Sequence, residues 1–226
     1  LLKDCSISIN NGKDQLKTSA SNFPIDIYYL RNGDIPQYLR DGVVDLAIVG
    51  ENLLIEKGED LKTLTSLGFS KCRVSIAVPK EAEYNSFQDL AGKKIATSYP
   101  KTVQKYLDQW GVAADLHIIN GSVEIAPNIG LSDAICDIVS SGSTLFKNNL
   151  KEVVEISRSE AVLVQASSVS DAAAATIDKL RFRIQSVLRA KQSKYILLNA
   201  PNDKIDAISS ILPVLKSPTV LSLAQE

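Results

Sequence analysis

The stretch Glu124–Leu145, EIAPNIGLSDAICDIVSSGSTL, decides the fold of this chain. Its pattern predicts a short helix, a glycine turn, a buried strand and a Ser/Gly/Thr loop that opens another helix. A buried strand followed by a loop and a helix is the repeating unit of α/β folds. Apolar runs and helical segments alternate along the rest of the chain as well. We therefore predict an α/β fold with mostly parallel sheets.

The loop at the end of this stretch suits a phosphate group. It offers backbone N–H groups, hydroxyl groups and the positive end of a helix to one anion. A glycine within the loop lets the backbone approach the anion closely. The same residues also fit an ordinary turn with a Ser or Thr helix cap. The candidate phosphate-binding residues are Ser140, Ser141, Gly142, Ser143 and Thr144.

Two carboxylates precede the loop. Asp133 and Asp137 are four residues apart, so on a strand both point to the same face. Carboxylates beside a bare phosphate would repel it, whereas ribose hydroxyls or a bound Mg²⁺ would explain them. A phosphate, a vicinal diol and a metal together describe a phosphoribosyl group.

Position by position, the stretch resembles the signature of the ATP phosphoribosyltransferase family. The matching residues are Glu124, Gly130, Ser132, Ile135, Asp137, Ile138, Ser141, Gly142, Thr144 and Leu145. Segments elsewhere follow the family order: DGVVDLAIVGEN (41–52), GFSKCRVSIAVP (68–79), GKKIATSYP (92–100) and NGSVEIAP (120–127). SKYILLNAP (193–201) and PTVLSLA (218–224) resemble the long-form branch in particular. The resemblance covers nearly the whole chain.

This resemblance implies an enzyme that joins ATP to 5-phosphoribosyl 1-pyrophosphate, the first step of histidine biosynthesis. Adenine N1 attacks C1 of the ribose while pyrophosphate leaves, so no protein nucleophile or base is needed. The loop would hold the 5-phosphate, Asp133 and Asp137 would address the ribose, and Glu124 would lie near the ribose or the metal. Mg²⁺ is expected to arrive on the substrate, near Asp133 and Asp137, rather than in a protein-built site.

Three further residues are candidates for the nucleotide side of the site. Glu51 follows a buried strand at its carboxyl end, where α/β sheets bind ligands, although a solvated loop acid fits equally well. Arg73 begins another strand and is either a surface charge or a partner for a nucleotide phosphate or pyrophosphate. Tyr99 precedes a helix and could stack on a base.

Composition excludes several classes of protein. A formal net charge of −1 and a pI near 6.0 argue against non-specific nucleic-acid binding, which needs a basic face. No apolar run approaches the roughly 18 residues of a membrane span. The three cysteines are odd in number and far apart, so neither a disulfide framework nor a zinc site is indicated. A cytoplasmic protein fits these observations, and the family implies homo-oligomers, as dimers or hexamers.

Periodicity and turn residues predict the individual elements. Pro100 suits the first turn of a helix reaching residue 110, and Gly111 suits its C-cap. The predicted strands are 43–49, 73–78, 94–97, 116–119, 134–139, 152–156, 195–198 and 219–223. The predicted helices are 100–110, 170–190 and 205–212.

The family resemblance implies a discontinuous, two-lobed core like that of type II periplasmic binding proteins. Lobe I would combine residues 1–73 and 158–212, and lobe II would comprise residues 74–157 with the phosphoribosyl loop. Ligands would bind between the lobes. Residues 213–226 would lead into a regulatory domain absent from this chain, so that histidine would inhibit only the full-length protein.

Two alternatives remain open at the level of sequence. A two-lobed protein that only binds a small molecule would have the same fold, because fold does not fix function. Another class of phosphoribosyltransferase would carry a different loop, preceded by two acids within a hydrophobic strand, and this chain lacks that pattern.

Overall fold

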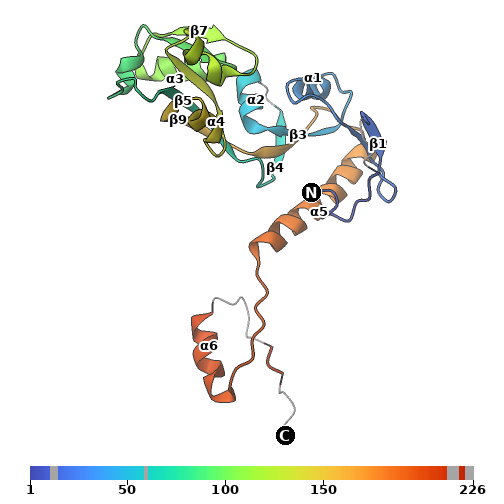
Figure 1. The fold of residues 1–226 in the computed structure, drawn as a ribbon. Helices are drawn as coiled ribbons and strands as arrows, with labels where there is room; N and C mark the ends of the chain where they lie inside the picture. Colours follow the sequence, from blue (N-terminus) through green and yellow to red (C-terminus); the bar gives the residue numbers. More distant parts are fainter. Residues whose placement is uncertain (11–14, 59–60, 213–218, 222–226) are drawn as a thin grey trace. The chain divides into compact units, whose positions relative to one another are not determined.

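The structure is a computed structural model that describes residues 1–10, 15–58, 61–212 and 219–221. The chain forms two compact units, residues 1–188 and 189–226, and helix α5 (Asp171–Gln192) crosses the boundary between them (Figure 1). The first unit holds both larger sheets and all the candidate site residues. No helix among the described residues is long and apolar enough to cross a membrane.

The larger sheet has the strand order β7-β6-β8-β5-β9. Its strands are β5 (Cys72–Pro79), β6 (Lys94–Thr97), β7 (Asp115–Ile118), β8 (Ala134–Val139) and β9 (Leu150–Ser159). Strand β6 pairs in parallel with β7 and β8, whereas β5 pairs antiparallel with β8 and β9. The predicted α/β fold is confirmed. Parallel pairs form only one half of this sheet. Sequence could not predict this division, because a buried apolar run predicts a strand but not the direction of its neighbour.

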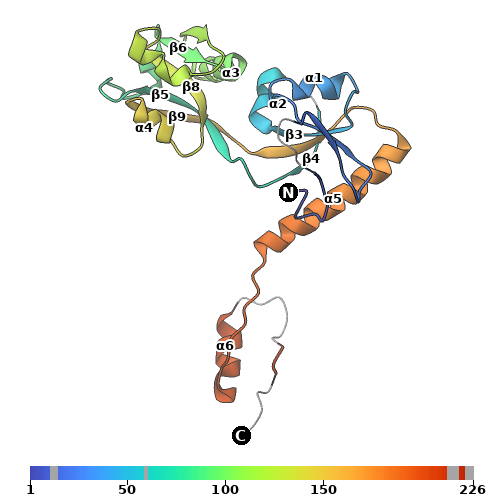
Figure 2. The same cartoon turned by 45° about the vertical axis from the view of Figure 1, so that its right-hand side comes forward.

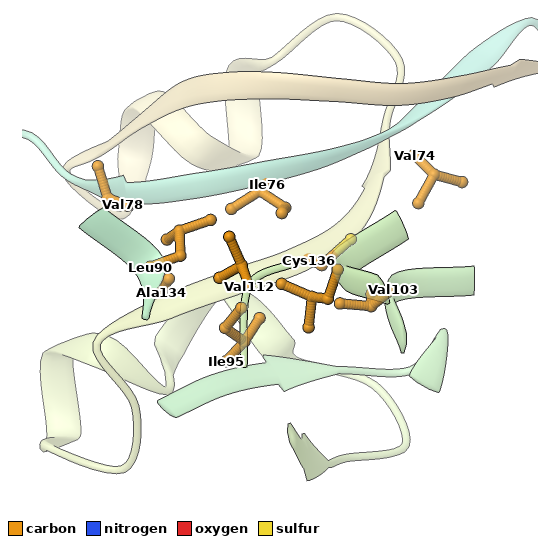
Figure 3. Close-up of a cluster of buried hydrophobic side chains, with 10 residues drawn as sticks. Val74, Ile76, Val78, Leu90, Ile95, Val103, Val112, Ala134 and Cys136 are labelled. Carbon is orange, nitrogen blue, oxygen red and sulfur yellow. The ribbon is translucent and has the colours of Figure 1, made fainter. Parts of the chain in front are cut away.

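The core of this sheet lies between its strands and helix α3 (Pro100–Trp110). Ile76, Ile95 and Cys136 come from three neighbouring strands and are fully buried together (Figure 3). Helix α3 begins with Pro100 and ends at Gly111, whose φ of +63° is the left-handed C-cap conformation. Both ends of this helix are as the sequence predicted. Short elements complete the region: η1 (Phe87–Leu90), η2 (Val123–Ile125), η3 (Pro127–Ile129) and α4 (Ser143–Lys147).

A second sheet, with the order β3-β10-β4, is antiparallel throughout its described pairs. Its strands are β3 (Leu46–Gly50), β4 (Lys62–Ser66) and β10 (Ala161–Gln165), and its core includes residues of α1 (Ile35–Arg40), α2 (Glu51–Lys57) and α5 (Figure 2). A two-stranded ribbon, β1 (Lys17–Ser19) with β2 (Asp26–Tyr28), accompanies it. The sequence reading did not identify β4, β10 or this ribbon.

The buried side chains of the first unit gather separately around the two sheets. Strands β5 and β9 pair along their length and lead from one core to the other. This separation supports the predicted two-lobed division. We propose that lobe I comprises residues 1–73 and 158–188 and that lobe II comprises residues 74–157.

The predicted end of lobe I at residue 212 was wrong, because residues 189–212 belong to the second unit. The strand expected at 195–198 is absent from the described elements, and Tyr195 and Leu197 are 90% and 82% exposed. A strand is stabilised by pairing and by side-chain packing, and this segment has neither in the described residues. The expected helix is present as α6 (Ile205–Ile211), after η4 (Asn202–Lys204). The last predicted strand covers residues 219–223. Residues 219–221 form no strand, and residues 222–223 lie outside the described part.

Candidate active site

The candidate phosphate loop, residues 140–144, lies at the carboxyl end of β8. Strands β6 and β8 are parallel, with Thr97 opposite Cys136, so both strands end at the same edge of the sheet. This is the edge at which α/β sheets bind ligands. The residues that follow the two strands, Ser98 and Ser140, therefore belong to one site.

The loop itself has an unusual backbone at one position. Gly142 has a φ of +77°, is the N-cap of α4 and has no side chain with which to cap the helix. The Ser141 hydroxyl donates to Ser143 Oγ at 3.0 Å and accepts from the Ser143 N–H at 3.4 Å. Ser140 and Thr144 are exposed. The start of α4 is thus open to solvent, with hydroxyl groups on both sides of a glycine.

Asp137 lies within β8, three residues before Ser140, and is partly buried. Its Oδ1 accepts a hydrogen bond from the Ile138 N–H at 2.8 Å and a longer one from Ser98 Oγ at 3.3 Å. Burial raises the pKa of this carboxyl above its usual value, and the negative charge of Glu124 raises it further. Glu124 belongs to η2, which packs against β8. The structure therefore brings Asp137, Glu124 and Ser98 together.

Asp133 is not part of this group, contrary to the sequence prediction. It precedes the first residue of β8, so about four residues of strand, or about 13 Å, separate it from Asp137. Its Oδ2 accepts a hydrogen bond from the Lys94 N–H at 2.8 Å, at the start of β6. The alternation of a strand places both on one face, but Asp133 lies just before β8 and Asp137 in its second half. Asp133 has a structural contact rather than a place beside the loop.

Arg73 contacts the loop instead of open solvent. From β5 its guanidinium donates two hydrogen bonds to the carboxylate of Glu152 on β9, and Nη1 donates to the Ser140 carbonyl at 3.2 Å. Both side chains are about three-quarters buried. The hydrogen bond to Arg73 lowers the pKa of the Glu152 carboxyl. Arg73 therefore holds the first residue of the loop.

The other two candidates for the nucleotide side differ in exposure. Glu51 is exposed at the first position of α2, in lobe I. Tyr99 is only 9% exposed, and its hydroxyl accepts a hydrogen bond from Asn52 Nδ2 at 2.9 Å. Burial raises the pKa of Tyr99 to about 12. In this structure the Tyr99 ring is packed between the lobes and is not free to stack on a base.

Sequence reasoning missed Glu152, Asn52 and Glu56. Asn52 and Glu56 are four residues apart on α2 and so share one helix face, a pattern that indicates a common contact. Nothing in the sequence says which distant residues they meet. Among the described residues, no three His, Cys, Asp or Glu side chains form a possible metal centre, and the three cysteines are free thiols.

Comparison with known proteins identifies relatives of the whole chain. The family described as ATP phosphoribosyltransferase matches residues 31–186, and the family described as HisG, C-terminal domain matches residues 190–226. This division agrees with the boundary between the two units of the structure. An ATP phosphoribosyltransferase of Bacteroides thetaiotaomicron is 50% identical over 226 residues, all of this chain and 80% of that protein. One of Cytophaga hutchinsonii is 49% identical, over all of this chain and 79% of that protein.

Solved structures give a consistent result. The ATP phosphoribosyl transferase (HisG:HisZ) complex of Thermotoga maritima includes a chain that matches with a TM-score of 0.71 and 28% identity, over 84% of this chain and 90% of that one. A substrate-binding protein of an amino acid ABC transporter matches with a TM-score of 0.54 and 17% identity, over 72% of this chain and 73% of that one. The second likeness shows the fold alone. It confirms the predicted resemblance to periplasmic binding proteins.

Proposed function

This chain belongs to the ATP phosphoribosyltransferase family, and we propose that the shared carboxyl edge of β6 and β8 is its active site. The reaction condenses ATP with 5-phosphoribosyl 1-pyrophosphate to give N1-(5-phosphoribosyl)-ATP and pyrophosphate, the first step of histidine biosynthesis. The observation that supports this location is the open Ser140–Thr144 loop directly beside Asp137, Glu124 and Ser98.

The loop holds the 5-phosphate of the donor. Backbone N–H groups at the start of α4 and the hydroxyls of Ser141, Ser143 and Thr144 are donors of the kind that bind phosphate. Arg73 positions the loop, because its hydrogen bond to the Ser140 carbonyl holds the first residue of the loop in place. A guanidinium already paired with Glu152 adds little net charge of its own.

Asp137 and Glu124 face the ribose. The reacting bond forms between adenine N1 and ribose C1 as the bond from C1 to the pyrophosphate oxygen breaks, with inversion. Positive charge develops on the ring in this transition state, and a carboxylate with few solvent contacts stabilises such charge strongly. Hydrogen bonds from ribose hydroxyls to Asp137 also orient C1 for attack.

The family requires a divalent metal ion, and we infer Mg²⁺ carried by the pyrophosphate group. Two carboxylates, Asp137 and Glu124, are oxygen ligands of the kind that Mg²⁺ accepts, whereas a complete protein-built site lacks a third partner in the described residues. Bound to the donor, the ion would neutralise charge on the leaving group.

The nucleotide approaches from the side of lobe I, where Glu51 is exposed, toward Ser98, which follows β6 in lobe II. We keep Glu51 as a nucleotide contact and assign Tyr99 and Arg73 to positioning the site rather than to direct contact. We also propose that the chain acts as a homo-oligomer.

Pyrophosphate release from ATP plus the phosphoribosyl donor tests the assignment, with each substrate alone as a control. Release that requires both substrates and a divalent metal is the expected result. Binding of one substrate without release would favour a protein that only binds a small molecule.

A further inference from the structure

Helix α2 of lobe I carries two buried polar side chains, Asn52 and Glu56, that each bond to residues of lobe II. Asn52 is 6% exposed and Glu56 is 8% exposed. Polar groups this deeply buried are costly unless they are hydrogen-bonded. Both are hydrogen-bonded, and their partners are at least 45 residues away along the chain.

Glu56 caps helix α3 from the opposite lobe. Its carboxylate accepts hydrogen bonds from the Lys101 N–H at 3.0 Å, the Thr102 N–H at 2.9 Å and Thr102 Oγ1 at 2.8 Å. A carboxylate at a helix N-terminus satisfies unpaired N–H groups and interacts favourably with the helix dipole. Because this carboxylate already occupies the start of α3, that helix end is less suited to a substrate phosphate than the Ser140–Thr144 loop.

Asn52 forms the second part of the contact. Its backbone N–H donates to Ser159 Oγ, that hydroxyl donates to Asn52 Oδ1, and Nδ2 donates to the Tyr99 hydroxyl, each at 2.9 Å. Gly50 makes room for this arrangement, since a Cβ there would lie 2.6 Å from Asn52 Oδ1. The backbone of Gly50, with a φ of −70°, would accept any residue. The absence of a side chain at residue 50 therefore serves the Asn52 contact.

We propose that Asn52 and Glu56 form an inter-lobe latch that positions the nucleotide half of the site. Ser98 and Tyr99 directly precede α3, and Glu51 directly precedes Asn52, so the latch fixes both faces between which ATP binds. The Ser140–Thr144 loop belongs entirely to lobe II, and its hydrogen bonds include that from Arg73 and those within the loop itself. The latch should therefore affect ATP and not the donor. This inference rests on the proposed function of that edge.

The test compares Glu56→Gln and Gly50→Ala with the wild type. Glu56→Gln replaces one of the two acceptor oxygens with an NH2 group, which donates and so cannot serve the backbone N–H or hydroxyl donors that met that oxygen. Gly50→Ala displaces Asn52 without strain in its own backbone. We expect each variant to raise the KM for ATP by about 10-fold or more, with the KM for the donor changed less than 2-fold. Glu83→Gln, at an exposed glutamate of lobe II, is the matched control.

A distance measurement reads the latch independently of activity. Spin labels at Lys62→Cys in lobe I and Lys105→Cys in lobe II, both exposed positions, are introduced in a Cys72→Ser background. A broader or longer distance distribution in Glu56→Gln and Gly50→Ala supports the latch. An unchanged distribution, or equal losses of affinity for both substrates, overturns it. If the wild type releases no pyrophosphate, the proposed function fails while the distance measurement still tests the latch.

Discussion

At the scale of the residue, Asp137 combines a functional position with an unfavourable environment. Its pKa is raised chiefly by burial, so the folded protein holds an ionised carboxylate where a neutral group would be more stable. Perturbed groups of this kind concentrate at functional sites. The folded-state pKa lies above the unfolded value, so the associated stability is complete below pH 3.8 and is lost as the pH rises through the folded-state value.

Asp137→Asn should therefore stabilise the protein at pH 7 while lowering kcat/KM by about 100-fold, because the amide carries no charge for the transition state. Thermal unfolding at pH 7 and near pH 4 measures the stabilisation of Asp137→Asn relative to the wild type, and this stabilisation should be smaller near pH 4. Asp115→Asn, at an exposed position of β7, is the control. Full activity in Asp137→Asn would contradict the assignment.

Gly142 supports a prediction about the donor. Gly142→Ala should weaken donor binding by about 30-fold, roughly 2 kcal/mol, because the Cβ occupies space beside the phosphate. Its φ of +77° adds backbone strain of about 1 kcal/mol. Gly111→Ala carries similar strain at a φ of +63° far from the loop. Calorimetric titration with the donor should separate the two, and equal affinity in both variants would exclude the loop as the phosphate site.

At the scale of the element, the pair Arg73–Glu152 joins β5 and β9 to the beginning of the loop. The two strands pair over most of their length, with register shifts at Val74/Ser75 and Ile76/Ala77, so the backbone that carries both side chains is held by the sheet. Sequence patterns identified each strand and the helix α3, whose ends have a proline and a glycine at the expected positions. They did not identify β4 and β10, whose pairing depends on residues about a hundred positions apart.

Glu152→Gln should reduce donor affinity by about 10-fold, because Arg73 is no longer held in position to bond the Ser140 carbonyl. The stability cost should be about 1 kcal/mol for this partly exposed pair. Arg73 lowers the pKa of Glu152, so the cost is present above pH 4.5 and disappears as the pH falls through the folded-state value. Glu155→Gln, which breaks a surface pair with Arg158 on the same strand, should leave donor affinity unchanged.

At the scale of the whole molecule, the contact between the lobes contains an ionisable group that is neutral at physiological pH. Tyr99 has a pKa raised from 10.0 to about 12, chiefly by burial. Its phenol remains protonated in the folded chain after the unfolded chain has begun to ionise. The stability due to this difference is complete below pH 10 and is lost between pH 10 and about pH 12.

Between pH 10 and about pH 12, the free energy of unfolding of Tyr99→Phe should therefore fall by about 2 kcal/mol less than that of the wild type. Denaturant unfolding at pH 9 and near pH 12 measures the difference. Tyr28→Phe, at a tyrosine that is 47% exposed, controls for general alkaline effects. If the free energy of unfolding of the wild type and of Tyr99→Phe changed equally with pH, Tyr99 would not be buried between the lobes in solution.

Local sequence patterns are sufficient to predict several features of this protein. Strand β8, its glycine-containing loop and the helix α3 depend on neighbouring residues, whose apolar spacing, caps and backbone freedom can be read in order. The same contiguous residues carried the resemblance to the family. Asp137 and the Ser140–Thr144 loop lie at one edge for this reason.

Tertiary structure alone decided which distant groups meet. It separated Asp133 from Asp137 along the strand, paired Arg73 with Glu152 and brought Glu56 to the start of α3. Each of these contacts depends on the order and direction of strands and on how α2 faces α3. Side-chain type limits what a residue can bind, but the partner it binds is set by the path of the whole chain.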